Sequence, residues 1–137
     1  MSKEKLNEKY IIYQILAQNI EGLKKQLEMV EEQLIELKST SLSMDDLEKI
    51  SESNEIFLPL GSGCFGKGKI TDNKKILVNA GAGVFMNEDL KNAKLSIEGN
   101  FKELERAGME IEEQMKKTIT QMNGLASEIQ AMAQKEE

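Results

Sequence analysis

Residues 56–86 read IFLPLGSGCFGKGKITDNKKILVNAGAGVFM, and this stretch decides the fold. Short runs of apolar and β-branched residues predict strands, and the Gly-rich or polar residues between them are typical of tight turns. The surrounding segment, 55–87, holds six of the ten glycines, the only proline and three of the four phenylalanines. We therefore expect two β-hairpins here, with the turn between them at residues 71–74.

Four short strands cannot close a barrel within one chain, and unpaired strand edges favour pairing with other chains. The hairpins therefore predict an oligomer. The side chains that we expect at its interfaces are Ile56, Leu58, Leu60, Phe65, Ile70, Ile76, Val78, Val84 and Met86.

Both flanks of the hairpin segment carry an apolar repeat with a spacing of about 3.5 residues, which is the pattern of a coiled coil. In the first flank the repeat consists of Tyr13, Leu16, Ile20, Leu23, Leu27, Val30, Leu34, Leu37, Ser41 and Met44. In the second flank it consists of Ile97, Phe101, Leu104, Gly108, Ile111, Met115, Thr118, Met122, Leu125, Ile129 and Met132. We expect two long helices that fold back on each other as an antiparallel pair, with both chain termini at the far tip.

Two details of the helices follow from polar residues. Asn87 precedes Glu88 and Asp89, so it is a candidate N-cap of the second helix, followed by acids that suit the positive helix end. Ser39, Thr40, Ser41 and Ser43 interrupt the first helix, and we expect a bend or break there.

Composition argues against most catalytic and binding classes. Lys plus Arg is 18 and Asp plus Glu is 24, so the formal net charge is −6, and aromatic residues are 4% with no Trp. Such a chain lacks the positive charge and stacking platforms that nucleic-acid binding uses. It has no His and one Cys, so it lacks an obvious catalytic base or metal ligand set. We expect no enzyme activity, cofactor or metal, and neither a signal peptide nor a membrane span, which places the protein in the cytoplasm.

The octapeptide from Gly61 to Gly68 matches the phosphate-binding loop G-x-x-x-x-G-K-[ST] at every position except the last. The missing hydroxyl would ligate magnesium, and a helix must follow the Lys. Because a strand and a turn are predicted there instead, glycines of a coiled sheet are the favoured interpretation. A nucleotide-binding enzyme is the weaker alternative.

The start of the first helix is more apolar than its repeat requires. With Tyr13 and Ile20 at heptad position a, Ile11 falls at f and Ile15 at c, and both point outward. Exposed apolar surface on a charged rod marks an interaction site, although these residues could instead widen the contact where the helices splay. The predicted tip surface consists of Leu6, Tyr10, Ile11, Ile15, Ile129 and Met132.

The order helix, two hairpins, helix, with the sequences of residues 59–70, 78–84 and 88–94, resembles the α class of the prefoldin family. Two hairpins point to the α class and not the β class, and the short termini resemble archaeal members. The resemblance implies an α+β fold in which a long antiparallel coiled coil carries two central hairpins that join an oligomeric β-barrel. It implies a single domain, residues 1–137, made of a helix (1–54), the hairpins (55–87) and a second helix (88–137).

The same resemblance implies a molecular chaperone that works without ATP. Two α and four β-class subunits would form a hexamer whose coiled-coil tips bind unfolded client proteins and deliver them to the group II chaperonin of the cytosol. Nucleic acids and membranes are not expected partners. A filament-forming structural protein of the same fold is the alternative.

Overall fold

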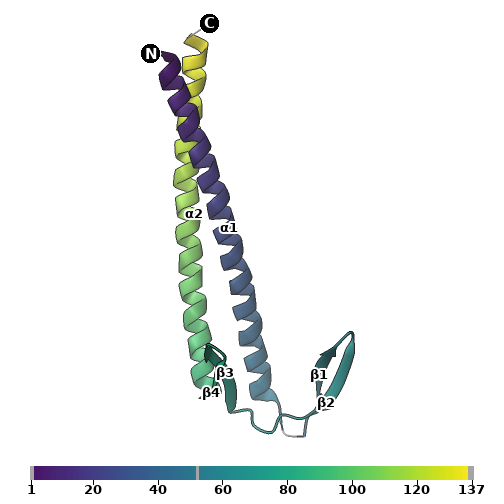
Figure 1. Cartoon of the computed structure of the whole chain (residues 1–137). Coiled ribbons are helices and arrows are strands. Elements are labelled where there is room, and N and C mark those ends of the chain that lie inside the picture. The colour runs from purple at the N-terminus through teal and green to yellow at the C-terminus, as the bar shows by residue number, and fades with distance from the viewer. Residues whose placement is uncertain (1, 52, 136–137) are drawn as a thin grey trace. The chain divides into compact units, whose positions relative to one another are not determined.

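A computed structural model describes residues 2–51 and 53–135. The elements along the chain are α1 (Ser2–Lys49), β1 (Ile56–Gly61), β2 (Cys64–Gly68), β3 (Lys75–Gly81), β4 (Val84–Asp89) and α2 (Leu90–Lys135), as Figure 1 shows. Two long helices with two antiparallel hairpins between them in sequence are the predicted α+β fold. Contacts divide the chain into two compact units, residues 1–34 with 103–137, and residues 35–102. The assignment of one domain to residues 1–137 stays a prediction.

The first unit is an antiparallel pair of helices. Gly108 of α2 is buried against α1, where a Cβ atom would lie 3.5 Å from Val30 Cγ1 and 3.9 Å from Leu27 Cδ1. Nearer the termini, the ammonium group of Lys9 forms an ion pair with the Glu128 carboxylate. The first turns of α1 therefore lie beside the last turns of α2, as predicted (Figure 1).

The predicted apolar repeat is the buried stripe of each helix. All ten repeat positions of α1 are half-buried, and the eleven of α2 are half-buried or buried, whereas most residues between them are exposed. Because each helix of a pair has one neighbour, only a narrow stripe of its surface is covered. The heptad interpretation is confirmed.

The break expected at residues 39–43 is wrong, because α1 continues through them to Lys49. The Thr40 hydroxyl donates a hydrogen bond to the Glu36 carbonyl (2.9 Å), and the Ser43 hydroxyl donates one to the Ser39 carbonyl (3.0 Å). A hydroxyl that donates to the carbonyl four residues earlier is hydrogen-bonded without interrupting the helix.

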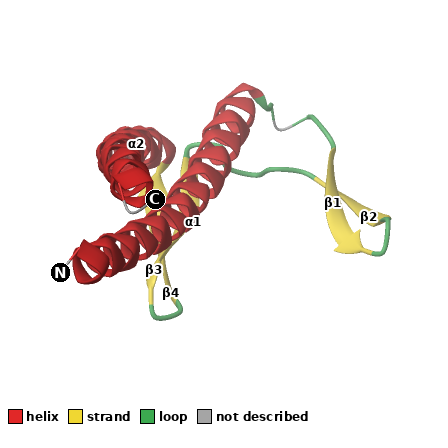
Figure 2. Cartoon of the chain, turned by 90° about the horizontal axis from the view of Figure 1, so that it is seen from above, coloured by secondary structure: helices red, strands yellow, loops and turns green. Residues whose placement is uncertain are grey.

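The two hairpins form separate two-stranded sheets that share one design (Figure 2). In β1–β2, Ile56 pairs with Gly68 and the register shifts between Pro59 and Gly61. In β3–β4 the corresponding shift lies between Asn79 and Gly81.

Each hairpin turns through a Gly-x-Gly sequence at positive φ. The φ angles are 109°, 51° and 78° at Gly61, Ser62 and Gly63, and 105°, 52° and 76° at residues 81–83. Glycine adopts this region without the steric cost of a Cβ atom. The apparent phosphate-binding loop is therefore a hairpin turn followed by β2, and Lys67 lies inside a strand where such a loop would need a helix to begin.

The N-cap predicted at Asn87 is wrong, because β4 extends to Asp89 and α2 begins at Leu90. Asn87 pairs with Leu77 and Asp89 pairs with Lys75. The Leu90 N–H then donates to the Lys74 carbonyl at 2.7 Å. β3 and the residue before it supply these partners, and a local helix-start signal cannot reveal a strand that pairs with a distant segment. The boundary between hairpins and second helix, predicted at 87/88, moves to 89/90.

Candidate interaction sites

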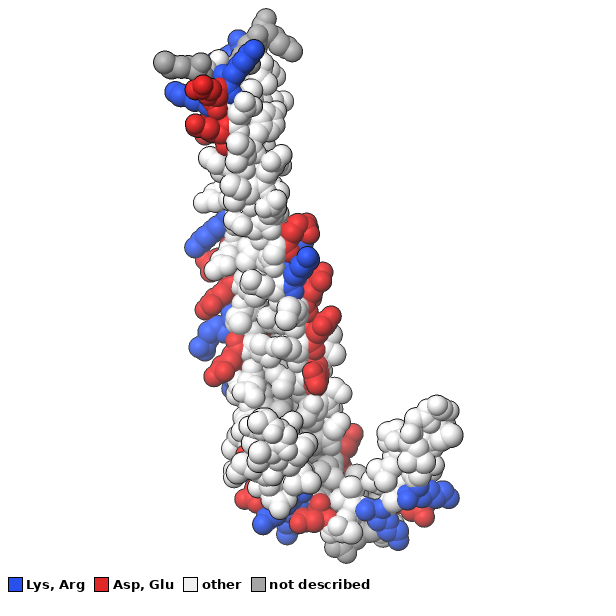
Figure 3. Space-filling model, viewed as in Figure 1, with Lys and Arg blue, Asp and Glu red and all other residues white. Residues whose placement is uncertain are grey.

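The hairpins expose large apolar side chains on both strands of each sheet. Five predicted interface residues have exposed fractions between 49% and 72%, namely Leu58, Leu60, Phe65, Val84 and Met86. The other four are half-buried, namely Ile56, Ile70, Ile76 and Val78, and Ile70 lies just beyond the end of β2. Figure 3 shows the outer part of the β1–β2 hairpin without charged residues. A two-stranded hairpin is marginally stable by itself, so such exposed surface requires further packing.

On the second face of the hairpins, sequence reasoning predicted Phe65 and missed the other apolar residues. Phe57, Leu77 and Phe85 are also exposed, at 60% to 66%. They pair with Lys67, Asn87 and Asn79, so they lie on the face opposite to Leu58 and Val78. The signal was present as uninterrupted apolar runs at 56–58, 76–78 and 84–86, which are typical of strands that are covered on both faces.

Near the terminal end of the helices, four apolar side chains of α1 lie outside the seam and remain accessible. We call Tyr10, Ile11, Ile12 and Ile15 the outer face of α1; their exposed fractions are 48%, 56%, 46% and 50%. The outward orientation predicted for Ile11 and Ile15 is confirmed. Ile12 was not among the predicted tip residues, although it is equally accessible.

The remaining predicted tip residues belong to the seam between the helices. Ile129 is only 7% exposed, while Leu6 and Met132 are half-buried. Ile129 is a poor candidate for contact with a client in this conformation, because its surface is already used by the helix pair. The accessible part of the tip surface is therefore the outer face of α1.

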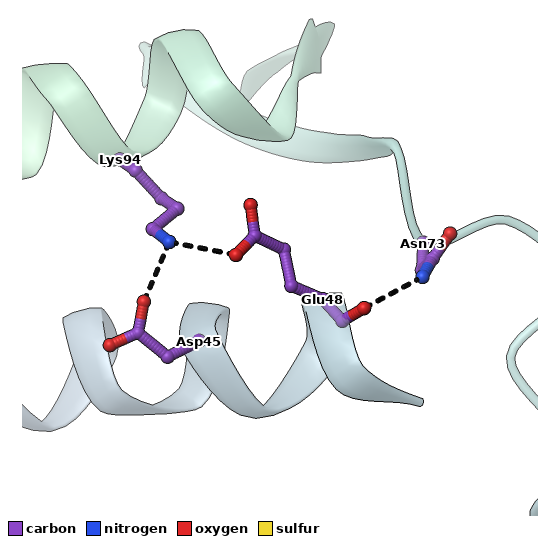
Figure 4. A network of polar contacts seen from close by, with 4 residues as sticks. All are labelled: Asp45, Glu48, Asn73 and Lys94. Carbon is purple, nitrogen blue, oxygen red and sulfur yellow. Dashed lines mark hydrogen bonds and ion pairs between the residues drawn. The ribbon is translucent and has the colours of Figure 1, made fainter. Parts of the chain in front are cut away.

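A polar cluster in the second unit ties three segments together (Figure 4). The Lys94 ammonium group lies 2.6 Å from Asp45 Oδ1 and 3.0 Å from Glu48 Oε2. The Asn73 side-chain amide donates to the carbonyls of Glu48 (3.3 Å) and Ile50 (3.2 Å), which lie at the end of α1. The cluster thereby joins the end of α1, the loop before β3 and the start of α2.

The same cluster changes the ionisation of its members. The hydrogen bond from Lys94 lowers the pKa of Asp45, and the hydrogen bonds to Asp45 and Glu48 raise the pKa of Lys94. The sequence did not predict this arrangement, because Lys94 is 46 residues from Glu48. Beside it lie the most buried apolar side chains of the unit, Leu90 and Ala93.

Among the described residues, no helix is both long and apolar enough to cross a membrane. Apolar side chains of the hairpins and of the start of α1 are left exposed by the single chain, which is typical of an interaction protein.

Comparison with known proteins names the family. The family model "Prefoldin subunit" matches residues 16–135. Prefoldin subunit alpha of Methanococcus aeolicus is 32% identical over 133 residues, which cover 94% of this chain and 90% of that protein. Its counterpart from Archaeoglobus fulgidus is 28% identical over 137 residues, covering 99% of this chain and 100% of that protein. The chain belongs to the prefoldin family, and the predicted resemblance is confirmed.

A solved structure has the same fold. The cryo-EM structure of filamentous PFD from Methanocaldococcus jannaschii matches with a TM-score of 0.72 at 20% identity, covering 89% of this chain and 98% of that one. At this identity the match concerns the fold alone.

Proposed function

We propose that this chain is the α-class subunit of a prefoldin chaperone that binds unfolded polypeptides without ATP in the cytoplasm and delivers them to a group II chaperonin. The observation that carries the proposal is the outer face of α1, where four apolar side chains remain about half exposed beside a seam that is already closed. The family and the alpha-subunit relatives support the chaperone assignment.

Assembly would use the hairpins. Both faces of each hairpin are apolar and exposed in the single chain, and each sheet has only two strands in the part of the chain that the structure describes. Subunits of the β class would cover these faces and pair with the free edges, in a hexamer of two α and four β subunits. Burial of apolar area at about 25 cal/mol per Å² would drive this association.

Client binding would need no specific pocket. Apolar contact is non-directional and scales with buried area, so Tyr10, Ile11 and Ile15 can contact clients of unrelated sequence. Each contact is weak, but several arms in one assembly raise the overall affinity through effective concentration.

The test is the double variant Ile11→Ser with Ile15→Ser in the assembled complex. Both side chains lie outside the seam, so we expect an unchanged melting temperature and an intact complex on size-exclusion chromatography. Suppression of aggregation of a chemically unfolded client should fall several-fold, because both apolar contacts are lost.

A matched control is Met29→Ser with Met109→Ser, which removes two equally exposed apolar side chains of the same unit away from the termini. We expect this control to protect the client as the wild type does. Equal protection by both variants would show that the outer face of α1 does not bind clients.

A second candidate is a structural filament protein, because the matched solved structure is described as filamentous. Purification of the chain alone and together with a β-class prefoldin subunit separates the two functions. A chaperone subunit forms a defined complex only with the partner, whereas a filament protein elongates alone, as electron microscopy would show.

A further inference from the structure

The two outer edges of the β1–β2 hairpin are not equivalent, because β1 contains Pro59. Proline has no N–H, and within a sheet it occupies edge positions where the missing donor would point away from the neighbouring strand. In an antiparallel ladder, inward and outward positions alternate along each strand and are shared by register partners. Pro59 pairs with Phe65 and Phe57 pairs with Lys67, so these four residues are the outward-facing ones.

The outer edges of β1 and β2 therefore differ in the backbone N–H donors that they offer. On β1, the outward N–H of Phe57 is followed by a position that has none. On β2, Phe65 and Lys67 both keep their N–H groups. An added strand would therefore find a continuous row of donors along β2 and an interrupted one along β1.

The two faces of β2 also differ in chemistry. Phe65 and Lys67 lie on one face, Lys69 follows directly after the end of β2, and both Lys side chains are exposed. The other face carries Gly66 and Gly68, which leave room for side chains that lean across from β1. Leu58 does so, because a Cβ atom on Gly68 would lie only 3.3 Å from Leu58 Cδ1. The exposed side of Leu58 is then available to a residue from a neighbouring strand.

We propose that the outer edge of β2 accepts a strand from another prefoldin subunit, and that this strand carries the triplet acid, large apolar residue, acid. The two carboxylates would pair across the strands with Lys67 and Lys69, while the apolar residue between them would lie on the glycine face against Leu58. This inference rests on the proposed assembly function and adds the edge and the partner chemistry.

The occupant is a different subunit and not a second copy of this chain. The strands of this chain read IFLPLG, CFGKG, KILVNAG and VFMNED, and none contains an acid, apolar, acid triplet. Self-pairing along β2 would also place lysines near lysines, because Lys67 lies in β2 and Lys69 directly follows the strand.

The direct test is hydrogen exchange of this chain, resolved to single amides, alone and after co-assembly with the β-class subunit of its source organism. We expect the amides of Phe65 and Lys67 to exchange at least tenfold more slowly in the complex than in the free chain. Protection of Phe57 in place of Lys67, in a complex that does form, would overturn the edge assignment and leave the proposed function standing. Absence of any complex would overturn both.

The charge requirement is tested by Lys67→Glu with Lys69→Glu, with Lys102→Glu and Lys116→Glu as a control of equal charge change on exposed helix positions. Cross-strand charge pairs are modest, so we expect the first variant to bind the partner about tenfold more weakly at low salt, with the difference shrinking as salt is added. The control should bind like the wild type. Equal affinities of both variants would overturn the acidic triplet.

Discussion

The terminal part of the helix pair and the part next to the hairpins use apolar residues in opposite ways. In the terminal unit, Ile129 is buried in the seam while Tyr10, Ile11 and Ile15 are left about half exposed. In the second unit, the start of α2 contains the two most buried apolar residues of the described chain, Leu90 at 2% and Ala93 at 3%. Burial at one place stabilises the fold, and exposure at the other keeps surface available for binding.

In the described part of the chain, the second unit also has more polar contacts between its segments than the terminal unit. The terminal unit is linked by the exposed ion pair between Lys9 and Glu128. The second unit has Lys94 between two carboxylates, and Asn73 bonded to two carbonyls at the end of α1. Single exposed ion pairs contribute little to stability, whereas several contacts on one segment fix its position. The comparison predicts that substitutions near Leu90 affect stability and that substitutions on the outer face of α1 affect binding.

The largest effect should come from Leu90→Ser. Removing a buried leucine leaves a cavity and places a hydroxyl in an apolar site, which costs about 3 kcal/mol. We expect the thermal unfolding midpoint, followed by circular dichroism, to fall by many degrees.

Leu95→Ser is the matched control for this change, since Leu95 lies on the same helix and is 64% exposed. Its midpoint should stay close to that of the wild type. If both variants have the same unfolding midpoint, the conclusion that the two regions differ in packing is wrong.

An intermediate effect of opposite sign is expected for Gly108→Ala in the terminal unit. A methyl group there would make ordinary contacts with Val30 and Leu27, and alanine favours the helix over glycine by about 1 kcal/mol. The unfolding midpoint should therefore rise.

Gly124→Ala separates the two contributions, because nothing lies within 4 Å of a Cβ atom at that position. It should gain the helix-propensity part alone. A Gly108→Ala variant that is less stable than wild type would mean that the seam is too tightly packed to accept a methyl group.

The sequence predicted those features that repeat along the chain. The seam of both helices follows from the heptad, and the outward direction of Ile11 and Ile15 follows from their positions within it. The hairpin turns follow from Gly-x-Gly, because few other residues adopt positive φ in succession.

What could not be predicted depends on contacts between distant segments. Strand pairing extends β4 to Asp89, where local signals favour a helix start at Asn87. The polar residues near position 41 gave a false break signal, because α1 continues through them and the hydroxyls of Thr40 and Ser43 bond within the helix. Lys94 contacts Asp45 and Glu48 only because the fold brings distant segments together. The apolar periodicity of the sequence does not predict these contacts.

The smallest effect on stability should come from Lys94→Met. The pH dependence of this effect shows which ionisable groups cause it. The pKa of Asp45 is lowered from its ordinary value of 3.8, so its contribution is present above that value and is lost as the pH falls through the lowered pKa. The pKa of Lys94 is raised from 10.5, so its contribution is present below that value and is lost as the pH rises through the raised pKa. The loss of stability in Lys94→Met should therefore be constant between about pH 5 and 9 and should shrink at both extremes.

Urea unfolding of the wild type and of Lys94→Met across this pH range measures that difference. Lys24→Met is the control, because Lys24 lies 3.8 Å from Glu21 on an exposed helix surface, where such a pair contributes almost nothing. A stability difference for Lys94→Met that persists unchanged below pH 3 would show that the effect does not come from the charge pairing of Lys94 with Asp45. The contrast between the two regions would then rest on Leu90 and Ala93 alone.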